Sequence, residues 1–266
     1  MIDLNEKPLC TIPRVMCWPV DNLELLKSQP NESVDLIYSD ILYGTGRDFG
    51  EYKDLKPKQD VIESHYLPRL IEMKRVLKQN GSIYLQMDTR INHWMRILMD
   101  KVFGYDNFKN EIVWEYYSVY NGNKCFAKLS DRILFYSLGE TKFNLQYKPY
   151  SNESIKRLRR KPSKKIDYRN SLFDTEFIIN RGKKVSDVWT DIPMIKGGKK
   201  YPTQKPKELI KRFVLASSNE NDVVADYYLG SGTTAEVCKE LNRNFIGCDI
   251  NPNAIELTKT RLNAET

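Results

Sequence analysis

The chain has 266 residues, of which 41% are hydrophobic and 29% charged, and its net charge is +7. This composition is typical of a globular protein with a sizeable core and excludes an intrinsically disordered chain. No stretch approaches the roughly 18 consecutive apolar residues of a transmembrane helix, and the start, MIDLNEKPLC, lacks the basic and apolar regions of a secretory signal.

Short strands and helices alternate along the first half of the chain. The apolar run Val34–Ser39 predicts a buried strand, and after a loop a helical pattern extends from about Val61 to Lys78, ending at Asn80-Gly81. Further strands are predicted at Ser82–Met87, Glu111–Tyr117 and Arg132–Ser137, with a helix at Ile91–Phe103.

The regular pattern resumes after a segment, from about Asn144 to Ile195, that has no clear period. Lys207–Ser217 then predicts an amphipathic helix introduced by a proline. A strand, a helix, a strand and a helix follow at Asp222–Tyr227, Thr233–Leu241, Asn244–Asp249 and Pro252–Leu262. Strands that alternate with helices indicate an α/β fold with a doubly wound, mostly parallel sheet.

The cysteines and histidines argue against metal and Ser-His-Asp chemistry. The five cysteines are an odd number without a C-x-x-C pair, which favours a reducing, cytoplasmic compartment. The two histidines, His65 and His93, fall on or near predicted helices, where a structural or surface role is usual. We therefore expect no metal site. The cysteines are Cys10, Cys17, Cys125, Cys238 and Cys248.

Positive charge is concentrated in one segment of the chain. Residues 142–212 contain 20 Lys and Arg against 7 Asp and Glu, a net of +13, whereas the rest has 22 against 28, a net of −6. An acidic body with a basic segment indicates a polyanionic partner, although a solvated, disordered loop would have the same charge. The interleaved aromatic residues favour a folded nucleic-acid-binding surface. They are Tyr147, Tyr150, Tyr168, Phe173, Phe177, Trp189 and Tyr201.

A glycine-rich loop, DYYLGSGTTA from Asp226 to Ala235, joins a predicted strand to a predicted helix. Gly230 and Gly232 allow a tight turn and a close approach to a ligand, and the first N–H groups of the helix can bind a carboxylate or a phosphate. Asp249 ends the next strand, 17 residues after Gly232, where an acid can accept hydrogen bonds from ribose hydroxyls. The loop therefore indicates a nucleoside cofactor. A dinucleotide fingerprint or an ordinary glycine turn remains as an alternative.

A second loop, Asp40-Ile41-Leu42-Tyr43, follows a predicted strand at the sheet edge where α/β proteins bind ligands. With it, the sequence resembles the DNA methyltransferases that methylate amino groups. Their catalytic loop reads Asp-Pro-Pro-Tyr in adenine enzymes, and their cofactor loop reads Asp-Pro-Phe-x-Gly-Ser-Gly-Thr-Thr. The segment YPTQKP, residues 201–206, looks like a third shared element.

The order of catalytic loop, basic insert and cofactor loop resembles the permuted β subgroup of that family. The resemblance implies a Rossmann-like methyltransferase fold. Residues 1–140 would form the catalytic half, 141–199 an inserted target-recognition region and 200–266 the cofactor-binding half. It also implies S-adenosylmethionine as cofactor and double-stranded DNA as substrate. A homodimer and a cognate restriction endonuclease are further expected partners.

The chemistry of the second loop suits an exocyclic amino group. The adenine amino nitrogen is a weak nucleophile because its lone pair is shared with the ring. Asp40 and the carbonyl of Ile41 can each accept one amino hydrogen and stabilise the charge that develops on nitrogen, and Asp40 can then help to remove a proton. The base must leave the duplex first, and Tyr43 offers a ring on which it can stack. Cytosine-N4 members commonly have serine in the first position, so Asp40 favours adenine N6.

The sequence departs from the family pattern in two places. Ile41 and Leu42 replace two prolines, which removes rigidity worth about 0.4–1 kcal/mol per site, and Tyr227-Tyr228 replaces Pro-Phe. Tyr228 can still form an aromatic wall beside the cofactor's adenine. These departures keep open an inactive, DNA-binding relative, and the glycine loop alone leaves a nicotinamide-dependent oxidoreductase.

The remaining site predictions follow from the resemblance and from charge. Thr203 and Lys205 would lie near the methionine end of the cofactor, with a solvent-facing lysine as the alternative for Lys205. The resemblance favours Asp226 as a contact for the polar groups of the cofactor, with a cap of the turn as the alternative. Phosphate contacts are expected from the basic segment. The predicted cofactor residues are Thr203, Lys205, Asp226, Tyr228, Gly230, Ser231, Gly232, Thr233, Thr234 and Asp249, and the predicted DNA-binding residues are Arg157, Arg159, Arg160, Lys161, Lys164 and Lys165.

Overall fold

One nine-stranded sheet forms the centre of the protein in the computed structural model, which describes residues 10–12, 14–50, 52–118, 124–160, 175–195 and 204–263. Within these residues its strands run in the order β1-β2-β11-β10-β3-β4-β6-β5-β9. Their bounds are β1 Cys10–Ile12, β2 Val15–Trp18, β3 Val34–Asp40, β4 Leu77–Met87, β5 Phe108–Glu115, β6 Ser130–Ser137, β9 Val188–Trp189, β10 Val223–Asp226 and β11 Asn244–Cys248.

The five strands from β2 through β11, β10 and β3 to β4 pair in parallel. Parallel strands need crossover connections, usually helices, which cover both faces of the sheet. Such strands are apolar on both sides, and six of the seven residues of β3 are buried. β6 and β5 add an antiparallel pair beyond β4. The predicted α/β class with a doubly wound, mostly parallel sheet is confirmed.

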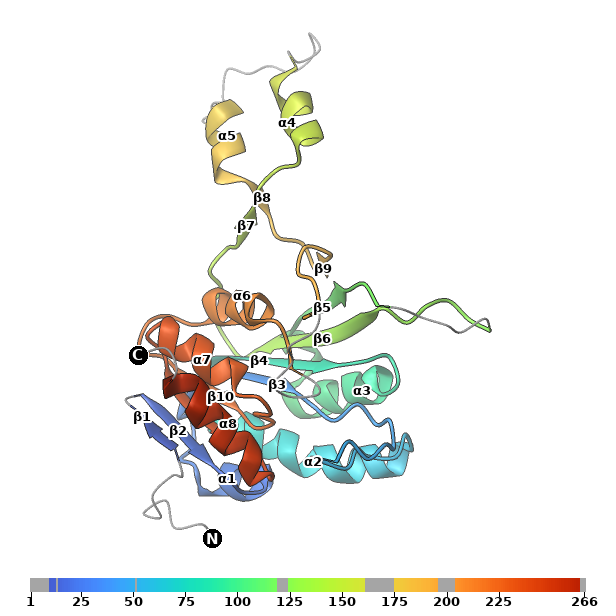
Figure 1. The fold of residues 1–266 in the computed structure, drawn as a ribbon, viewed down its shortest axis with the longest axis vertical. Helices are drawn as coiled ribbons and strands as arrows, with labels where there is room; N and C mark the ends of the chain where they lie inside the picture. The colour runs from blue at the N-terminus through green and yellow to red at the C-terminus, as the bar shows by residue number, and fades with distance from the viewer. Residues whose placement is uncertain are drawn as a thin grey trace. The chain divides into compact units, whose positions relative to one another are not determined.

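Six helices cover the two faces of the sheet within the described residues (Figure 1). α1 (Asn22–Ser28), α2 (Gln59–Val76) and α3 (Asn92–Phe103) pack side by side on one face. α6 (Lys207–Ser217), α7 (Thr233–Glu240) and α8 (Pro252–Asn263) form the layer on the other face. A single 3₁₀ turn, η1 (Tyr105–Asn107), follows α3. None of the helices in the described ranges is both long and apolar enough to cross a bilayer.

Residues Leu145–Ser186 form a second compact unit, separate from the unit that contains the sheet. Its described elements are β7 (Tyr147–Lys148), α4 (Asn152–Arg159), α5 (Thr175–Arg181) and β8 (Lys183–Lys184), with β7 and β8 paired antiparallel. Ser151 caps α4, accepting a hydrogen bond from the Ser154 amide. The second unit is thus shorter than the predicted insert 141–199, because β9 beyond it pairs with β5 of the first unit.

The connection between α2 and β4 differs from the prediction. The sequence predicts a helix to Lys78 and a strand from Ser82, but α2 ends at Val76 and β4 begins at Leu77. Leu77 pairs with Val34 in the sheet, and the ammonium of Lys78 lies 2.8 Å from the carboxylate of the buried Asp35. These contacts with β3 hold the segment as a strand, which the Asn-Gly turn signal did not predict.

Candidate active site

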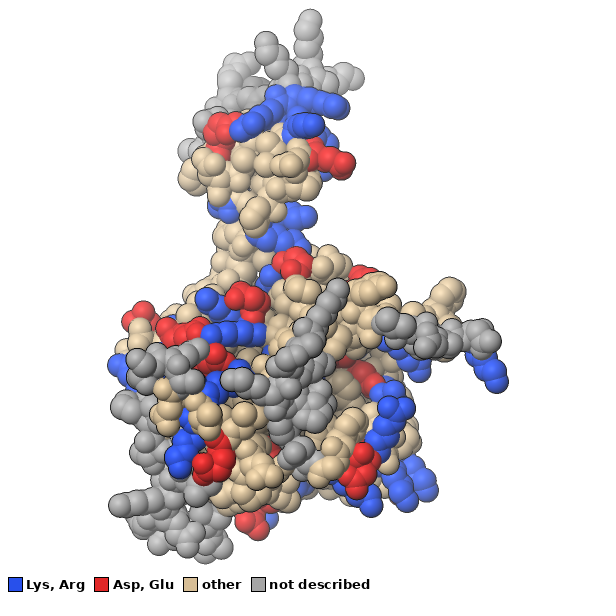
Figure 2. All heavy atoms as spheres, in the orientation of Figure 1, with Lys and Arg blue, Asp and Glu red and all other residues tan. Residues whose placement is uncertain are grey.

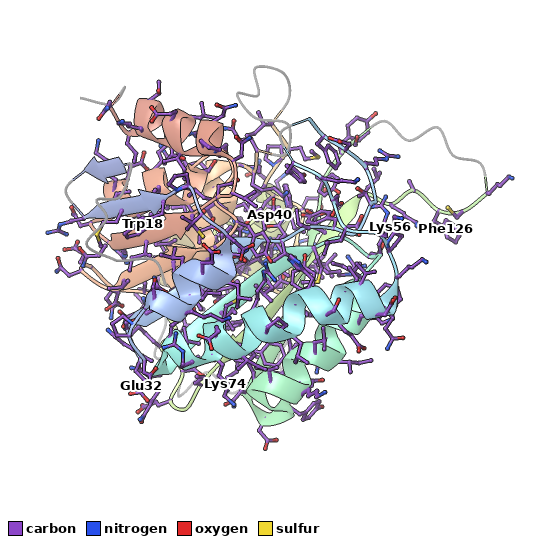
Figure 3. All side chains as sticks on the ribbon, turned by 90° about the horizontal axis from the view of Figure 1, so that it is seen from below. Trp18, Glu32, Asp40, Lys56, Lys74 and Phe126 are labelled. Carbon is purple, nitrogen blue, oxygen red and sulfur yellow. The ribbon has the colours of Figure 1, made fainter. Side chains whose placement is uncertain are left out.

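Two loops meet at the carboxyl ends of the neighbouring parallel strands β3 and β10. Asp40 ends β3 and Asp226 ends β10, so both loops open on the same edge of the sheet. Figure 3 shows Asp40 among the central elements of the first unit, whereas Glu32, ahead of the other end of β3, lies at its periphery. A cavity of about 470 Å³ lies over this edge, and all its lining residues belong to the first unit.

Almost all predicted catalytic and cofactor residues that the structure describes line this cavity. Gly232 is the exception, and it lies directly between two lining residues. Thr203 falls outside the described residues. The lining predicted residues are Asp40, Ile41, Leu42, Tyr43, Lys205, Asp226, Tyr228, Gly230, Ser231, Thr233, Thr234 and Asp249.

The loop after β3 is held by hydrogen bonds at the positions where the resembling family has prolines. The amide of Ile41 donates to the carbonyl of Gln86 on β4 at 3.1 Å, a bond that a proline cannot make. The hydroxyl of Tyr66 on α2 donates to the carbonyl of Leu42 at 2.8 Å. Because the Ile41 side chain is buried in the core, this loop is fixed by packing as well.

The chain beyond Tyr43 is anchored by one buried carboxylate. Asp54 accepts hydrogen bonds from the amides of Gly44 at 3.0 Å and Thr45 at 2.7 Å, and also from the Thr45 hydroxyl. Phe49 and Tyr52, which stack with ring centroids 5.0 Å apart, come from the same segment and line the cavity. The anchor thus fixes one wall of the cavity.

The Asp40 carboxylate lies between a cation and a phenol. The ammonium of Lys205 donates to Oδ2 at 2.5 Å, and the hydroxyl of Tyr43 lies 2.7 Å from Oδ1. Burial raises the pKa of Asp40, and the nearby carboxylate of Asp131 acts in the same direction, while Lys205 and the Tyr43 hydroxyl lower it. The side chain of Lys205 is only 13% exposed, so the solvent-facing alternative for this lysine is wrong.

The glycine loop is packed closely against Thr258 of α8. Gly232 has a φ of +73°, and a Cβ there would lie 2.2 Å from Oγ1 of Thr258, so only glycine fits. The amide of Gly230 donates to the carboxylate of Asp249 at 2.9 Å. This bond ties the acid after β11 to the glycine loop, and both line the cavity.

Asp226 is buried, and its carboxyl group accepts hydrogen bonds from residues of its own loop. Its oxygens accept from the amide of Tyr228 at 3.1 Å and from the hydroxyl of Thr234 at 2.6 Å. Burial raises the pKa of Asp226 to about 7, and the charge of Asp40 adds to the effect. The Thr234 side chain therefore holds the turn by its hydrogen bond to Asp226. The first backbone amides of a helix lack partners within that helix, so those at the start of α7 are candidates for binding a ligand.

The two tyrosines of the cofactor loop have different environments. Tyr227 is buried in the core, where its hydroxyl donates to Oε1 of Gln29 at 2.6 Å and its amide donates to the hydroxyl of Ser39 at 3.2 Å. Tyr228 lines the cavity with its hydroxyl 3.3 Å from Nε2 of His65. Tyr228 is thus part of the cavity lining, whereas the side chain of Tyr227 belongs to the core.

Several cavity residues come from segments to which the sequence assigned no site. Arg69 on α2 forms an ion pair with Asp21 at 2.8 Å and donates to Oδ1 of Asn22, and Asn22 donates to the carbonyl of Tyr227. His65, expected to be structural or on the surface, lines the cavity. Burial and the Arg69 charge lower its pKa to about 4, so it is neutral at pH 7. The only local signal was Asp21, which precedes the apolar run of α1 as an N-cap.

The predicted DNA-binding residues divide between described and undescribed parts of the chain. Lys161, Lys164 and Lys165 lie outside the described residues. Arg157, Arg159 and Arg160 are exposed at the end of α4, where Figure 2 shows Lys and Arg atoms gathered on the second unit. Arg159 forms an ion pair with Glu176 on α5 at 2.8 Å. Across the described ranges, no cluster of His, Cys, Asp and Glu has the arrangement of a metal site.

Comparisons with known proteins cover both halves of the sheet-containing unit. The family model described as DNA methylase matches residues 34–260. The type II methyltransferase M.HpaI of Haemophilus parainfluenzae is 34% identical over 247 residues, covering 91% of this chain and 72% of its own. DNA adenine methyltransferase YhdJ of Escherichia coli (strain K12) is 32% identical over 254 residues, covering 91% of this chain and 80% of its own.

Solved structures share the fold at lower identity. PvuII DNA methyltransferase (cytosine-N4-specific) has a TM-score of 0.67 at 18% identity, over 96% of this chain and 88% of that chain. The M1.HpyAVI–SAM complex has a TM-score of 0.61 at 19% identity, over 94% of this chain and 99% of that chain. Both structures place the chain's architecture among methyltransferase folds.

Proposed function

Because this chain belongs to the DNA methylase family, we propose that it transfers the methyl group of S-adenosylmethionine to N6 of adenine in DNA. The observation that carries the proposal is that Asp40 and Tyr43 line the same cavity as the glycine loop. A base amino group and a nucleoside cofactor can therefore meet within one site. The relative YhdJ, a DNA adenine methyltransferase, supports adenine as the base.

The residues around the glycine loop fit S-adenosylmethionine. Asp249 would accept from the ribose hydroxyls, and the first amides of α7, at Thr233 and Thr234, would bind the methionine carboxylate. Tyr228 would form the wall beside the adenine ring. The space that a Cβ at Gly232 would fill is taken by Thr258, so this glycine lets the loop pack directly against α8. When bound there, the cofactor supplies an electrophilic methyl group.

Asp40 and the Ile41 carbonyl act on the target amino group. A carboxylate has about four lone-pair sites, so Asp40 can accept an amino hydrogen while keeping its contacts with Lys205 and Tyr43. The Ile41 carbonyl accepts the second hydrogen, and together they direct the nitrogen lone pair toward the methyl group. An aspartate in this position favours adenine N6 over cytosine N4, where serine is common.

We assign target recognition and phosphate contacts to the second unit. Residues 145–186 contain 12 Lys and Arg against 4 Asp and Glu, and cations that neutralise phosphates make binding depend on salt. Replacing Arg157 and Arg160 together by alanine should lower the slope of log K against log salt by about 0.9 per lost contact. Lys27→Ala, on α1 of the first unit, is the matched control, and an unchanged slope in the double variant would contradict the assignment.

Two experiments separate the proposal from its alternatives. Thermal-shift titration should show stabilisation by S-adenosylhomocysteine, and stabilisation by NAD alone would instead support a nicotinamide enzyme. Tritium should pass from labelled cofactor to unmethylated DNA. A folded, cofactor-binding protein that transfers no tritium would be the inactive relative.

The family membership also suggests partners and a location. We propose a homodimer that acts in the cytoplasm, where DNA is accessible, and a cognate restriction endonuclease that cuts the unmethylated site. Several of the relatives carry type II methyltransferase names. Light scattering of the purified protein tests the dimer, and cleavage of unmodified DNA by a co-expressed neighbour tests the endonuclease.

A further inference from the structure

Three oxygen atoms lie in a row beside the cavity. The hydroxyl oxygen of Tyr43 is 2.7 Å from Oδ1 of Asp40 and 2.7 Å from Oδ2 of Asp131. A phenol has one hydrogen, and an ionised carboxylate can only accept. Two short contacts of this kind need two hydrogens, so the row holds one more proton than two ionised aspartates and a tyrosine would supply.

Asp131 is a residue to which the sequence assigned no role, and it is fixed from three sides. It lies in β6 and is 2% exposed. Its Oδ2 accepts from Nε2 of Gln86 at 2.7 Å, and its Oδ1 accepts from the hydroxyl of Tyr116 at 3.1 Å. Tyr38 donates to the other end of the Gln86 amide, which orients the amide NH₂ toward Asp131. The carboxyl of Asp131 is therefore positioned to face Tyr43.

Charged and titratable groups surround the row on every side. Lys205 lies against Asp40, and the carboxyl of Asp226 at the end of β10 is near enough to interact with it. The carboxyl of Asp88, which follows β4, interacts with Asp131. Burial raises the pKa of the Tyr43 hydroxyl well above its usual range, and both aspartates add to the effect, so the tyrosine keeps its hydrogen. The extra proton therefore belongs to the two aspartates. The facing groups are Lys205, Asp226, Asp88, Tyr38 and Tyr116.

We propose that Asp131 is a positioning residue for methyl transfer, because it shares one proton with Asp40 through the hydroxyl of Tyr43. With the proton on Asp131, that acid donates to Tyr43, Tyr43 donates to Asp40, and Asp40 is an ionised acceptor for the amino hydrogen. With the proton on Asp40, both hydrogen bonds run the other way: Asp40 donates to Tyr43 and Tyr43 donates to Asp131. Asp40 can then no longer act as a base. The positioning role of Asp131 rests on the proposed function, whereas the shared proton follows from the hydrogen bonds alone.

The shared proton is tested in the free enzyme, without any methyl transfer. Infrared spectroscopy near neutral pH should show the carbonyl band of a protonated carboxyl group. Asp40→Asn and Asp131→Asn should each remove that same band, because a single remaining carboxylate needs only the Tyr43 hydrogen. Asp226→Asn is the matched control and should remove only its own, separate band. A band that survives either of the first two substitutions would overturn the shared proton.

The effect on catalysis is tested by the pH profile of kcat/KM. The last proton leaves the Asp40–Asp131 pair at a raised pH because its loss places two negative charges side by side. Asp131→Asn leaves Asp40 without a second carboxyl group, so the acid limb should move to lower pH, by about one unit. In a Tyr43→Phe background the same substitution should move the limb less, because the connecting hydroxyl is gone. S-adenosylhomocysteine binding and thermal unfolding show whether each variant is folded. An unchanged acid limb in a folded Asp131→Asn enzyme would overturn the positioning role.

Discussion

The loops after β3 and β10 both have another residue where the resembling family has a proline, but their aspartates have different surroundings. Each has an N–H where the resembling family has a proline, and each uses it to bond a neighbouring strand. Ile41 donates to Gln86 on β4, and Tyr227 donates to Ser39 on β3. The rigidity that proline would provide is supplied here by hydrogen bonds and by burial of the Ile41 and Tyr227 side chains.

The two aspartates that open these loops differ in what they contact. Asp40 contacts a lysine and a tyrosine that line the cavity and remains able to accept from a ligand. Asp226 is satisfied by its own loop through Tyr228 and Thr234. We therefore propose that the first loop exchanges protons, whereas the hydrogen bonds of Asp226 hold the shape of the second, although both loops lie at the same sheet edge.

The largest expected effect comes from removing the acceptor of the first loop. Asp40→Asn should reduce kcat by roughly 10²–10⁴-fold, the range of general-base catalysis, while S-adenosylhomocysteine binding stays close to that of the unaltered enzyme. Tritium transfer and calorimetry measure the two quantities. Asp106→Asn, at an exposed site, is the control. Wild-type turnover in Asp40→Asn would remove the distinction between the loops.

A substitution that distorts the glycine loop after β10 should lower both stability and cofactor affinity. Gly232→Ala places a Cβ against Thr258 at a φ of +73°, so both thermal stability and cofactor affinity should fall, the latter by about tenfold or more. Gly50→Ala is matched in φ, at +79°, but meets no atom within 4 Å. It should therefore show only the cost of the positive φ, about 1–2 kcal/mol. Equal losses in both variants would contradict the close packing of the loop.

The pH dependence of the free energy of unfolding should show the raised pKa of Asp226. The unfolded chain releases the Asp226 proton near pH 3.8, whereas the folded protein keeps it to about pH 7. The folded state therefore binds more protons in this window, and stability falls as pH rises from about 4 to 7. Asp226→Asn cannot ionise, so its stability relative to the unaltered protein should rise across that window, by about 1.4 kcal/mol per pKa unit at most. A difference that is independent of pH would show that Asp226 titrates normally.

The smallest expected effect is on the free energy of unfolding, when Ile41 is replaced by the proline that the resembling family has at this position. Ile41→Pro loses the bond to Gln86, worth about 0.5–1.5 kcal/mol, and part of its packing, but gains about 0.4–1 kcal/mol from a stiffer unfolded chain. Ile41→Val keeps the N–H and is the control. Urea unfolding should find the proline variant less stable than the valine variant. The reverse order would mean that the hydrogen bond adds little.

The alternation of strands and helices predicted the sheet class because each element carries its own apolar period. The two loops were predictable for the same reason, since Asp40 and the glycines lie within short contiguous motifs. Asp131, Arg69 and Asn22 were not, because each reaches the site only through pairing or packing with segments far away in the sequence. Leu77 was predicted as helical from the local Asn-Gly turn signal, but it is in a strand because it pairs with Val34, which is far away in the sequence.

The identity of the methylated base tests the proposed chemistry most directly. Unmethylated DNA would be treated with the enzyme and S-adenosylmethionine, digested to nucleosides and analysed by mass spectrometry. We expect N6-methyladenine from the unaltered protein and none from Asp40→Asn. N4-methylcytosine as the product, or N6-methyladenine formed equally well without the Asp40 carboxylate, would contradict it.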